Sequence, residues 1–266
     1  TKYHRIRVMN NKIKNILKKK NKSKIICLTA YSKNIAEIVD DHADIVLVGD
    51  SLGSVLYNYD TTRKVSLNMM IEHTKSARMS VKKSLLVIDL PYNTYRNKFE
   101  ALKNSKKAIK ETKCDAVKVE GGTRVKEIVK HLVKNKIPVL GHIGITPQTA
   151  KGKFRSKGKN ESEIRKLLKD ARDLEQSGAF GMVLECIYSD ISKQITSAIN
   201  IPTIGIGASV NCDGQVLVTD DLIGLNETKF RFVKKFGNIK KDIKSAVIKY
   251  KNSVKQKKFP SKKNSY

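Results

Sequence analysis

Several features are missing from the 266-residue sequence, and each absence argues against a class of protein. No apolar run approaches the roughly 18 residues that a membrane helix needs, and no signal peptide with a small-residue cleavage site is found. No CxxC pair and no regular ladder occurs among the four cysteines, which argues against a zinc site or a disulfide framework. We therefore expect a cytoplasmic protein with reduced thiols at Cys27, Cys114, Cys186 and Cys212.

Acidic residues are scarce as well, with 25 Asp and Glu against 54 Lys and Arg, which gives a net charge of +29. A nucleic-acid binder would gather this charge in one patch with interleaved aromatic residues. Here the lysines are spread along the chain, tryptophan is absent and the aromatic residues do not cluster with the basic runs. Net charge by itself indicates solubility and nonspecific binding, not a specific binding site. We therefore expect no specific nucleic-acid partner. A noncatalytic nucleic-acid binder is the alternative from another class.

The main feature that the sequence does contain is a series of eight short runs rich in β-branched residues. A hydrophobic fraction of 39% is enough for a real core, and the length suits an α/β barrel, which typically needs about 250 residues. Most of the runs are continuously apolar, as strands covered on both faces of a parallel sheet are. The strands are predicted at residues 25–31, 45–51, 85–91, 116–122, 137–144, 181–187, 201–208 and 215–224.

Helical patterns fill most of the gaps between these strands. The alternation predicts an α/β fold, a (β/α)8 TIM barrel, with a doubly wound open sheet as the alternative. The gap at 208–215 is too short for a full helix and is the weakest part of the strand count. Helices are predicted at residues 32–42, 67–80, 99–113, 123–136, 161–178 and 190–200.

The two ends of the chain are basic and are expected to differ in structure. Ile13, Ile16 and Leu17 have helical spacing, so we expect a short N-terminal helix that caps the domain. No linker divides the rest of the chain. The sequence therefore predicts one barrel domain over residues 1–250 and a basic C-terminal tail over residues 251–266.

Four of the predicted strands carry a carboxylate late in the run: Asp50, Asp89, Glu120 and Glu185. In a barrel, the carboxyl ends of the strands form the rim at which active sites lie. Several carboxylates in one pocket repel each other unless a cation lies among them, and hard oxygen ligands suit Mg²⁺. An ordinary ion pair is the plainer explanation for any single acid, but not for the set.

Two basic side chains share these strand ends. Period-two alternation places Lys118 on the face of Glu120, and by the same rule Asp50 on the face of Val48. Lys118 could form a Schiff base, hold a substrate carboxylate or neutralise a neighbouring acid, and a metal site favours the second role. His142, late in the fifth strand, is either a satisfied polar residue or a hydrogen-bond partner of an oxyanion.

Glycine-rich turns follow two of the strands, at residues 120–122 and 205–208. They are consistent with tight βα turns and close approach of the backbone to a ligand. Neither turn matches GxGxxG, so a dinucleotide is not indicated.

A resemblance to a known family rests on eight motifs that cover nearly the whole chain. The motifs are LTAY (28–31), VLVGDSLG (46–53), DLP (89–91), VKVEGG (117–122), PVLGHIGITPQ (138–148), LEQSGAFGMVLEC (174–186), IPTIGIGA (201–208) and CDGQVLVTDDLIG (212–224). Together they are far more specific than any one of them. They make the sequence similar to the ketopantoate hydroxymethyltransferase family, in which they occur in the same order.

The resemblance implies a homo-oligomeric (β/α)8 barrel, a decamer in the family, with bound Mg²⁺. It implies transfer of a hydroxymethyl group from 5,10-methylenetetrahydrofolate to 3-methyl-2-oxobutanoate through an enolate, giving 2-dehydropantoate for pantothenate biosynthesis. By position, the metal would be held by Asp50, Asp89 and Glu120. The keto acid would contact Asp50, Ser51, Asp89 and Lys118, and Glu185 would be the proton acceptor.

Three departures from the family pattern are visible. The loop at 149–163 is shorter than the Gly-rich loop expected there, Ser32 replaces an acid, and Lys64 replaces a proline. Metal-dependent barrels of the phosphoenolpyruvate mutase and isocitrate lyase type are the alternative among enzymes. They also place acids around Mg²⁺ near a keto acid, but they need no folate.

Overall fold

The computed structural model describes residues 10–149, 155–227 and 230–266. The chain divides into two compact units, the first ending at Val218 and the second running from Thr219 to Tyr266. Among the residues that the structure describes, the first unit holds the eight strands and the regular elements of the second are helical. None of the described helices is long and apolar enough to cross a membrane.

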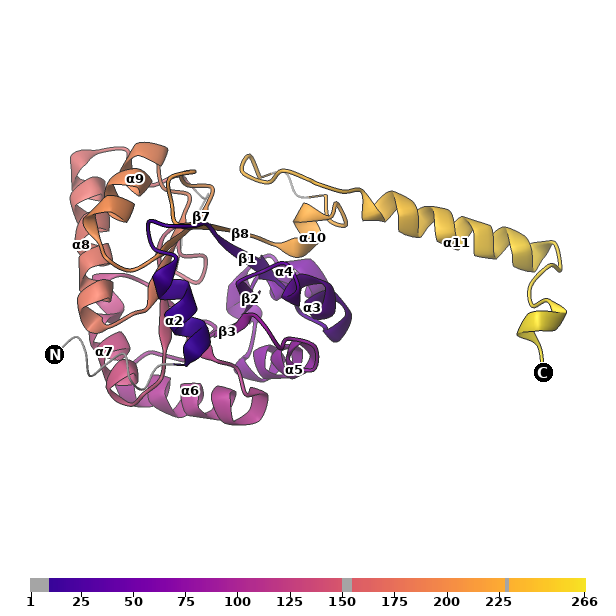
Figure 1. Cartoon of the computed structure of the whole chain (residues 1–266), viewed down its shortest axis with the longest axis horizontal. Helices are drawn as coiled ribbons and strands as arrows, with labels where there is room; N and C mark the ends of the chain where they lie inside the picture. Colours follow the sequence, from indigo (N-terminus) through magenta and orange to yellow (C-terminus); the bar gives the residue numbers. More distant parts are fainter. Residues whose placement is uncertain (1–9, 150–154, 228–229) are drawn as a thin grey trace. The chain divides into compact units, whose positions relative to one another are not determined.

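The first unit is a closed parallel barrel, as the sequence predicted (Figure 1). Each strand pairs with the next along the chain, and β8 pairs with β1. The closure rules out the open sheet. The strands are β1 (Ile25–Thr29), β2 (Ile45–Val48), β3 (Leu85–Asp89), β4 (Ala116–Glu120), β5 (Val139–Gly144), β6 (Gly181–Glu185), β7 (Thr203–Ile206) and β8 (Gly214–Leu217).

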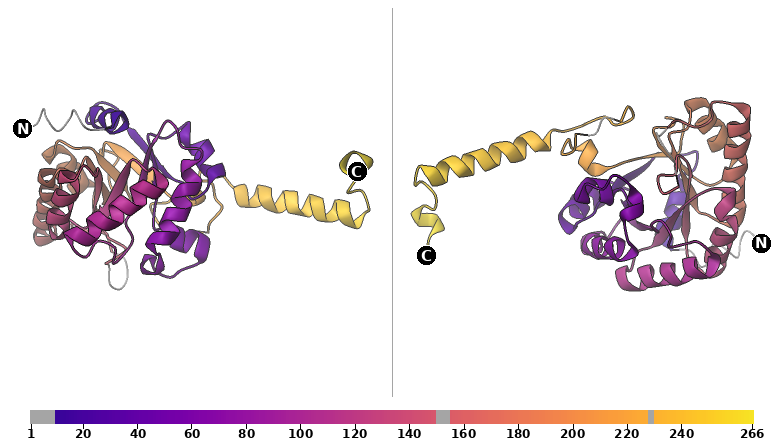
Figure 2. Two further views of the ribbon diagram at one scale, coloured as in Figure 1. Left: turned by 90° about the horizontal axis from the view of Figure 1, so that it is seen from below. Right: turned by 180° about the vertical axis from the view of Figure 1, so that it is seen from behind.

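Helices lie outside the strands of this unit (Figure 2). The six predicted helices are confirmed to within a few residues at each end. The short helix α4 and the 3₁₀ turn η1 (Thr62–Lys64) were not predicted, and the helix predicted at 123–136 begins with a 3₁₀ turn, η2 (Thr123–Val125). The helices are α2 (Asn11–Lys18), α3 (Lys33–Asp40), α4 (Leu52–Tyr57), α5 (Leu67–Arg78), α6 (Lys98–Thr112), α7 (Lys126–Lys134), α8 (Glu161–Ser177) and α9 (Ser189–Ala198).

The barrel encloses an apolar layer at the amino ends of its strands. Alternate strand residues such as Ile25, Ile45 and Leu85 point into it, whereas their neighbours pack against the helices. Ile13 and Ile16 of α2 belong to the same inner cluster. Helix α2 therefore closes the amino end of the barrel, which confirms the predicted capping helix. All four cysteines are free thiols, as expected.

The strand register brings polar residues together at the opposite, carboxyl end. Asp89 of β3 pairs with Lys118 of β4, and Glu120 of β4 pairs with His142 of β5. Glu185 ends β6 beside Gly144 of β5. Three consecutive strand pairs thus present charged side chains on one rim, whereas the inner positions nearer their amino ends are apolar.

The second unit contains α10 (Thr219–Leu222), α11 (Ile239–Lys255) and η3 (Lys262–Asn264). The strand predicted to run to residue 224 is wrong beyond Leu217, since residues 219–222 are helical. Asp220 and Asp221 in the first turn favour that helix through the helix dipole. The division predicted between residues 250 and 251 falls inside α11, which buries none of its side chains.

Candidate active site

Lys118 and Asp89 form a buried ion pair across β3 and β4. Lys118 Nζ lies 2.9 Å from Asp89 Oδ1, and both side chains are at most 6% exposed. Burial alone would lower the pKa of Lys118, but the surrounding carboxylates, Asp89 first among them, raise it. The amine is therefore a charged group that can hold an anion, which disfavours the Schiff-base role because that role needs a neutral amine.

Asp50 reaches the site through a turn rather than through its strand. Strand β2 ends at Val48, which packs in the outer cluster against the helices. The alternation that placed Asp50 on the face of Val48 was therefore wrong, because the chain has already left the extended conformation. The N–H of Asp50 donates to Asp89 Oδ2 at 3.1 Å, so the turn itself is held against the neighbouring strand.

Burial and like charge act together on Asp50. They hold its pKa well above the ordinary range, with desolvation as the larger cause and the negative charges of Asp89 and Glu120 next. A divalent cation would relieve this repulsion, and three buried carboxylates are the hard oxygen donors that Mg²⁺ prefers. The chemistry of the donor set therefore fits Mg²⁺.

The acids do not form a closed metal cage. Among the described residues no three His, Cys, Asp or Glu side chains are grouped tightly enough to enclose an ion. Mg²⁺ keeps several waters and is commonly held by one or two carboxylates together with substrate oxygens. The arrangement fits an open, partly hydrated site of this kind.

His142 stands between two acids. Its Nδ1 lies 3.4 Å from Glu120 Oε1 and its Nε2 lies 3.2 Å from Glu185 Oε2, and these are close ionic contacts rather than well-formed hydrogen bonds. Burial alone would lower the pKa of His142, but the two carboxylates raise it to about 9. Burial raises the pKa of Glu120, and His142 with Lys118 more than offsets this, so that the pKa falls below its ordinary value.

Glu185 is the most accessible acid of the group. Its side chain is 20% exposed, whereas those of Glu120 and Asp89 are 2% exposed. Gly144 lies beside it with φ +101°, and a Cβ there would stand 2.2 Å from the carbonyl oxygen of Glu185. Only glycine fits this close approach, which brings the end of β5 against Glu185.

Gln148 is a site residue that the sequence reasoning missed. Its side-chain Nε2 donates to Asp50 Oδ2 at 2.8 Å and to the carbonyl of Leu90 at 3.0 Å. Its backbone N–H donates to Glu120 Oε2 at 3.1 Å, and Tyr95 donates to its Oε1 at 2.5 Å. The residue ends the motif PVLGHIGITPQ, and that position was the only signal in the sequence.

Ser51 adjoins this group, whereas Ser32 and Lys64 are exposed. The Oγ of Ser51 is 2.8 Å from the hydroxyl of Tyr31, directly after Asp50 in the chain. Ser32 is the N-cap of α3, and Lys64 pairs with Asp60 on the surface at 2.8 Å. Of the shortened loop, residues 150–154 lie outside the described residues.

Comparison with known proteins places this barrel in a family. The family model described as ketopantoate hydroxymethyltransferase matches residues 10–262. The chain belongs to the ketopantoate hydroxymethyltransferase family. It is 62% identical over 258 residues to 3-methyl-2-oxobutanoate hydroxymethyltransferase of Pelagibacter ubique, covering 97% of this chain and 100% of that protein. It is 47% identical to the protein of the same name from Rhizobium etli, over 89% of this chain and 88% of that one.

Solved structures agree with the fold. A phosphoenolpyruvate phosphomutase from Streptomyces platensis superposes with a TM-score of 0.62 at 9% identity, covering 92% of this chain and 87% of that one. A phosphonopyruvate hydrolase, solved with oxalate and Mg²⁺, gives 0.58 at 8% identity, covering 95% and 93%. At such identities the likeness shows the barrel fold alone, so it gives the lyase alternative no support beyond a shared fold. The resemblance to the ketopantoate hydroxymethyltransferase family is confirmed by the family model and the relatives.

Proposed function

We propose that the chain transfers a hydroxymethyl group from 5,10-methylenetetrahydrofolate to 3-methyl-2-oxobutanoate, using the rim acids and Lys118. Water supplies the hydroxyl oxygen, and the products are 2-dehydropantoate and tetrahydrofolate. Family membership makes the chain a hydroxymethyltransferase of pantothenate biosynthesis. The observation that carries the mechanism is an accessible carboxylate, Glu185, beside a buried group of acids and one ammonium.

The keto acid would be anchored by its carboxylate. The ammonium of Lys118, held charged by Asp89, offers the positive partner, and the hydroxyl of Ser51 offers a donor next to Asp50. Asp50, Asp89 and Glu120 would hold Mg²⁺, which when bound supplies stabilisation of negative charge on the keto oxygen. The fixed charges of this end of the barrel thus favour a substrate that becomes more negative during the reaction.

Glu185 would remove the proton from C3 of the keto acid. It is exposed enough to meet a substrate, and His142 lies 3.2 Å from its Oε2. The imidazole is close enough to orient this carboxylate toward a substrate, and general-base catalysis of this kind contributes about 10²–10⁴-fold in rate. Water adds to the methylene carbon of the folate and releases it as formaldehyde, which leaves tetrahydrofolate. The C3 carbanion then adds to the formaldehyde carbon, and the aldehyde oxygen takes up a proton to become the new hydroxyl.

Product analysis tests this function. Proton NMR of 3-methyl-2-oxobutanoate with enzyme and Mg²⁺ is followed before and after methylenetetrahydrofolate is added. We expect signals of 2-dehydropantoate only when the folate is present. Conversion of the keto acid to the same extent with and without folate would favour a lyase-type reaction. No conversion under either condition would overturn the proposal.

We further propose that the working form is a cytoplasmic homo-oligomer. Family membership supports assembly, as does α11, which exposes Ile243 by 47%, Val247 by 59% and Val254 by 43%. The four free thiols support a reducing compartment.

A further inference from the structure

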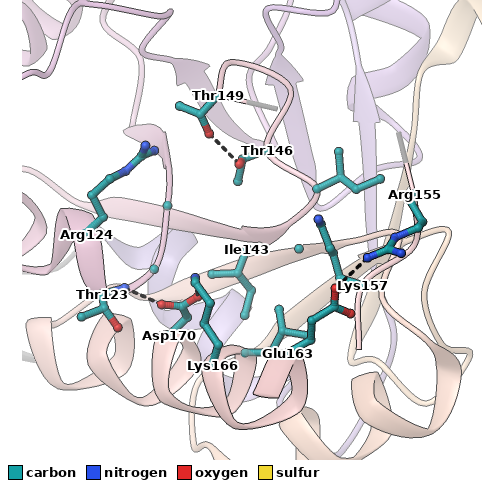
Figure 3. A pocket seen from close by; sticks show the side chains of 15 residues that line it. Thr123, Arg124, Ile143, Thr146, Thr149, Arg155, Lys157, Glu163, Lys166 and Asp170 are labelled. Carbon is teal, nitrogen blue, oxygen red and sulfur yellow. Dashed lines mark hydrogen bonds and ion pairs between the residues drawn. The ribbon is translucent and has the colours of Figure 1, made fainter. Parts of the chain in front are cut away.

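A cavity of about 710 Å³ lies beside the candidate active site, between the turn after β4, the segment after β5 and α8 (Figure 3). Its lining begins one residue beyond the candidate site residues, since Gly121 follows Glu120 and Ile143 follows His142. The N–H of Ile145, another lining residue, donates to the carbonyl of Glu185 at 2.9 Å. The cavity and the proposed site of proton removal therefore share the same strand ends.

The lining combines an apolar part with an excess of positive charge. Ile143, Ile145 and Leu167 are at most 5% exposed and supply the apolar part. The charged lining consists of two carboxylates, Glu163 and Asp170, and four cations, Arg124, Arg155, Lys157 and Lys166. The cavity thus carries a formal excess of two positive charges.

The two carboxylates are already engaged. Glu163 pairs with Arg155 at 3.2 Å and also accepts the backbone N–H groups of Gly158 and Lys159. Asp170 pairs with Lys166 at 2.6 Å and accepts the N–H of Thr123.

Two cations remain for a ligand. In the part of the chain that the structure describes, neither Arg124 nor Lys157 forms an ion pair, and Figure 3 draws no contact from either side chain. An apolar wall with a few unneutralised cations is what an anionic, partly aromatic ligand requires.

We propose that this cavity binds the aminobenzoylglutamate end of the folate cosubstrate, with Arg124 and Lys157 contacting its carboxylates. The inference rests on the proposed function. A folate carries its reactive methylene at the pterin end and its carboxylates at the far end, beyond an aromatic ring. With the methylene near Glu185, the ring would meet the apolar wall and the carboxylates would meet the cations. Additional glutamates on the folate would add further anionic groups near the same cations.

Steady-state kinetics of Arg124→Ala, Lys157→Ala and the double variant test this site. Each lost charge pair is expected to raise KM for methylenetetrahydrofolate about fivefold, as an exposed ion pair of about 1 kcal/mol would. The double variant is expected to lose most of the preference of the wild type for a polyglutamylated over a monoglutamylated donor. KM for the keto acid and kcat should stay unchanged. Arg172→Ala, on the exposed side of α8, is the matched control for charge.

Binding measurements separate this inference from the proposed function. Calorimetry with p-aminobenzoylglutamate alone should show binding to the wild type and weaker binding to the double variant, without any turnover. Folate-free exchange of the C3 proton should be equal in both proteins. An unchanged affinity and folate KM in the double variant would overturn the cavity assignment and leave the function standing. Wild-type protein that binds the probe but forms no product would overturn the function instead.

Discussion

Gln148 organises the acids of the site although it carries no charge. One side-chain amide reaches Asp50 and the carbonyl of Leu90, while the backbone of the same residue reaches Glu120. The side chain is 1% exposed, so these hydrogen bonds do not compete with bulk water. Gln148 therefore fixes the direction in which a carboxylate of the proposed metal site points.

Replacing Gln148 by leucine removes the donor to Asp50 at similar volume. Because groups that orient metal ligands typically contribute 10–100-fold in affinity or activity, we expect the apparent Mg²⁺ affinity to weaken about 10–100-fold. The Mg²⁺ dependence of C3-proton exchange measures this. Gln176→Leu, on the exposed side of α8, is the control. A Mg²⁺ dependence equal to that of the wild type would mean that Asp50 is oriented without Gln148.

For single residues, the sequence predicted the positions of the charged side chains of the candidate site better than those of the neutral ones. Asp89, Glu120 and Glu185 end strands, and Lys118 lies two residues before Glu120, so the period of two could predict that they share a rim. Asp50 could not be placed by alternation, because it lies in a turn. Gln148 lies beyond β5, where no periodicity applies, and its role depends on contacts with residues far away in the sequence.

Among the elements, α2 stabilises the barrel from the end opposite the site. Ile13 is fully buried against the inner cluster, whereas Ile38 of α3 is 67% exposed. Ile13→Ala should lower the free energy of unfolding by about 2–4 kcal/mol, since it leaves a cavity. Ile38→Ala should change it by about 0.5 kcal/mol or less. Urea unfolding measures both, and equal effects would show that α2 does not close the barrel.

Asp213 ties the start of β8 to the segment after α2. Its Oδ2 lies 2.9 Å from Lys20 Nζ and accepts the N–H of Thr203, and its Oδ1 accepts the N–H of Asn21. Burial alone would raise the pKa of Asp213, but these donors together lower it. The folded pKa is below the unfolded value, so the stabilisation is present above the unfolded pKa, about 3.9, and is lost as the pH falls through the folded pKa.

Asp213→Asn should therefore destabilise the protein most near neutral pH. We expect a loss of about 3 kcal/mol at pH 7, in the range for breaking a buried pair, and a smaller difference between variant and wild type only below about pH 4. Urea midpoints between pH 7 and pH 3.5 provide the measurement. Asp41→Asn removes an exposed ion pair with Lys83 and serves as the control. A pH-independent difference would contradict the account.

Element boundaries depended on how clearly each pattern ended. The apolar run from residue 215 onward read as one long strand, although the strand ends at Leu217 and α10 begins two residues later. Helix α11 was not predicted. Its apolar residues Ile239, Ile243 and Val247 have helical spacing, but the many lysines between them hide this pattern. Its side chains are all exposed or half-buried, so no core marked it as structured.

For the whole molecule, the proposed homo-oligomer depends on apolar surface that the chain exposes. Val247→Glu places a charge in the exposed apolar row of α11 and should shift sedimentation toward smaller species, because a buried charge opposes association. Lys249→Glu, two residues away and so on another side of the helix, should leave assembly unchanged. Wild-type protein that sediments as a monomer would contradict the proposal.

The fold and the chemical class could be predicted together, because both depend on the same repeated pattern of an apolar strand that ends in an acid. Eight apolar strands define a barrel, and the acids at their ends mark the rim at which we propose that the reaction takes place. The substrate could not be read from that pattern. It came from eight motifs in family order, and the match over residues 10–262 confirmed the family. The geometry of the strand ends alone would also fit Mg²⁺-dependent barrels that act on different keto acids.

Deuterium exchange at C3 of 3-methyl-2-oxobutanoate, without folate, tests the central claim that Glu185 is the base. Followed by proton NMR in D₂O, the wild type should lose the C3 signal only when Mg²⁺ is present. Glu185→Gln should exchange about 10²–10⁴ times more slowly, while calorimetry shows Mg²⁺ binding retained. Exchange by Glu185→Gln at the wild-type rate would contradict the account.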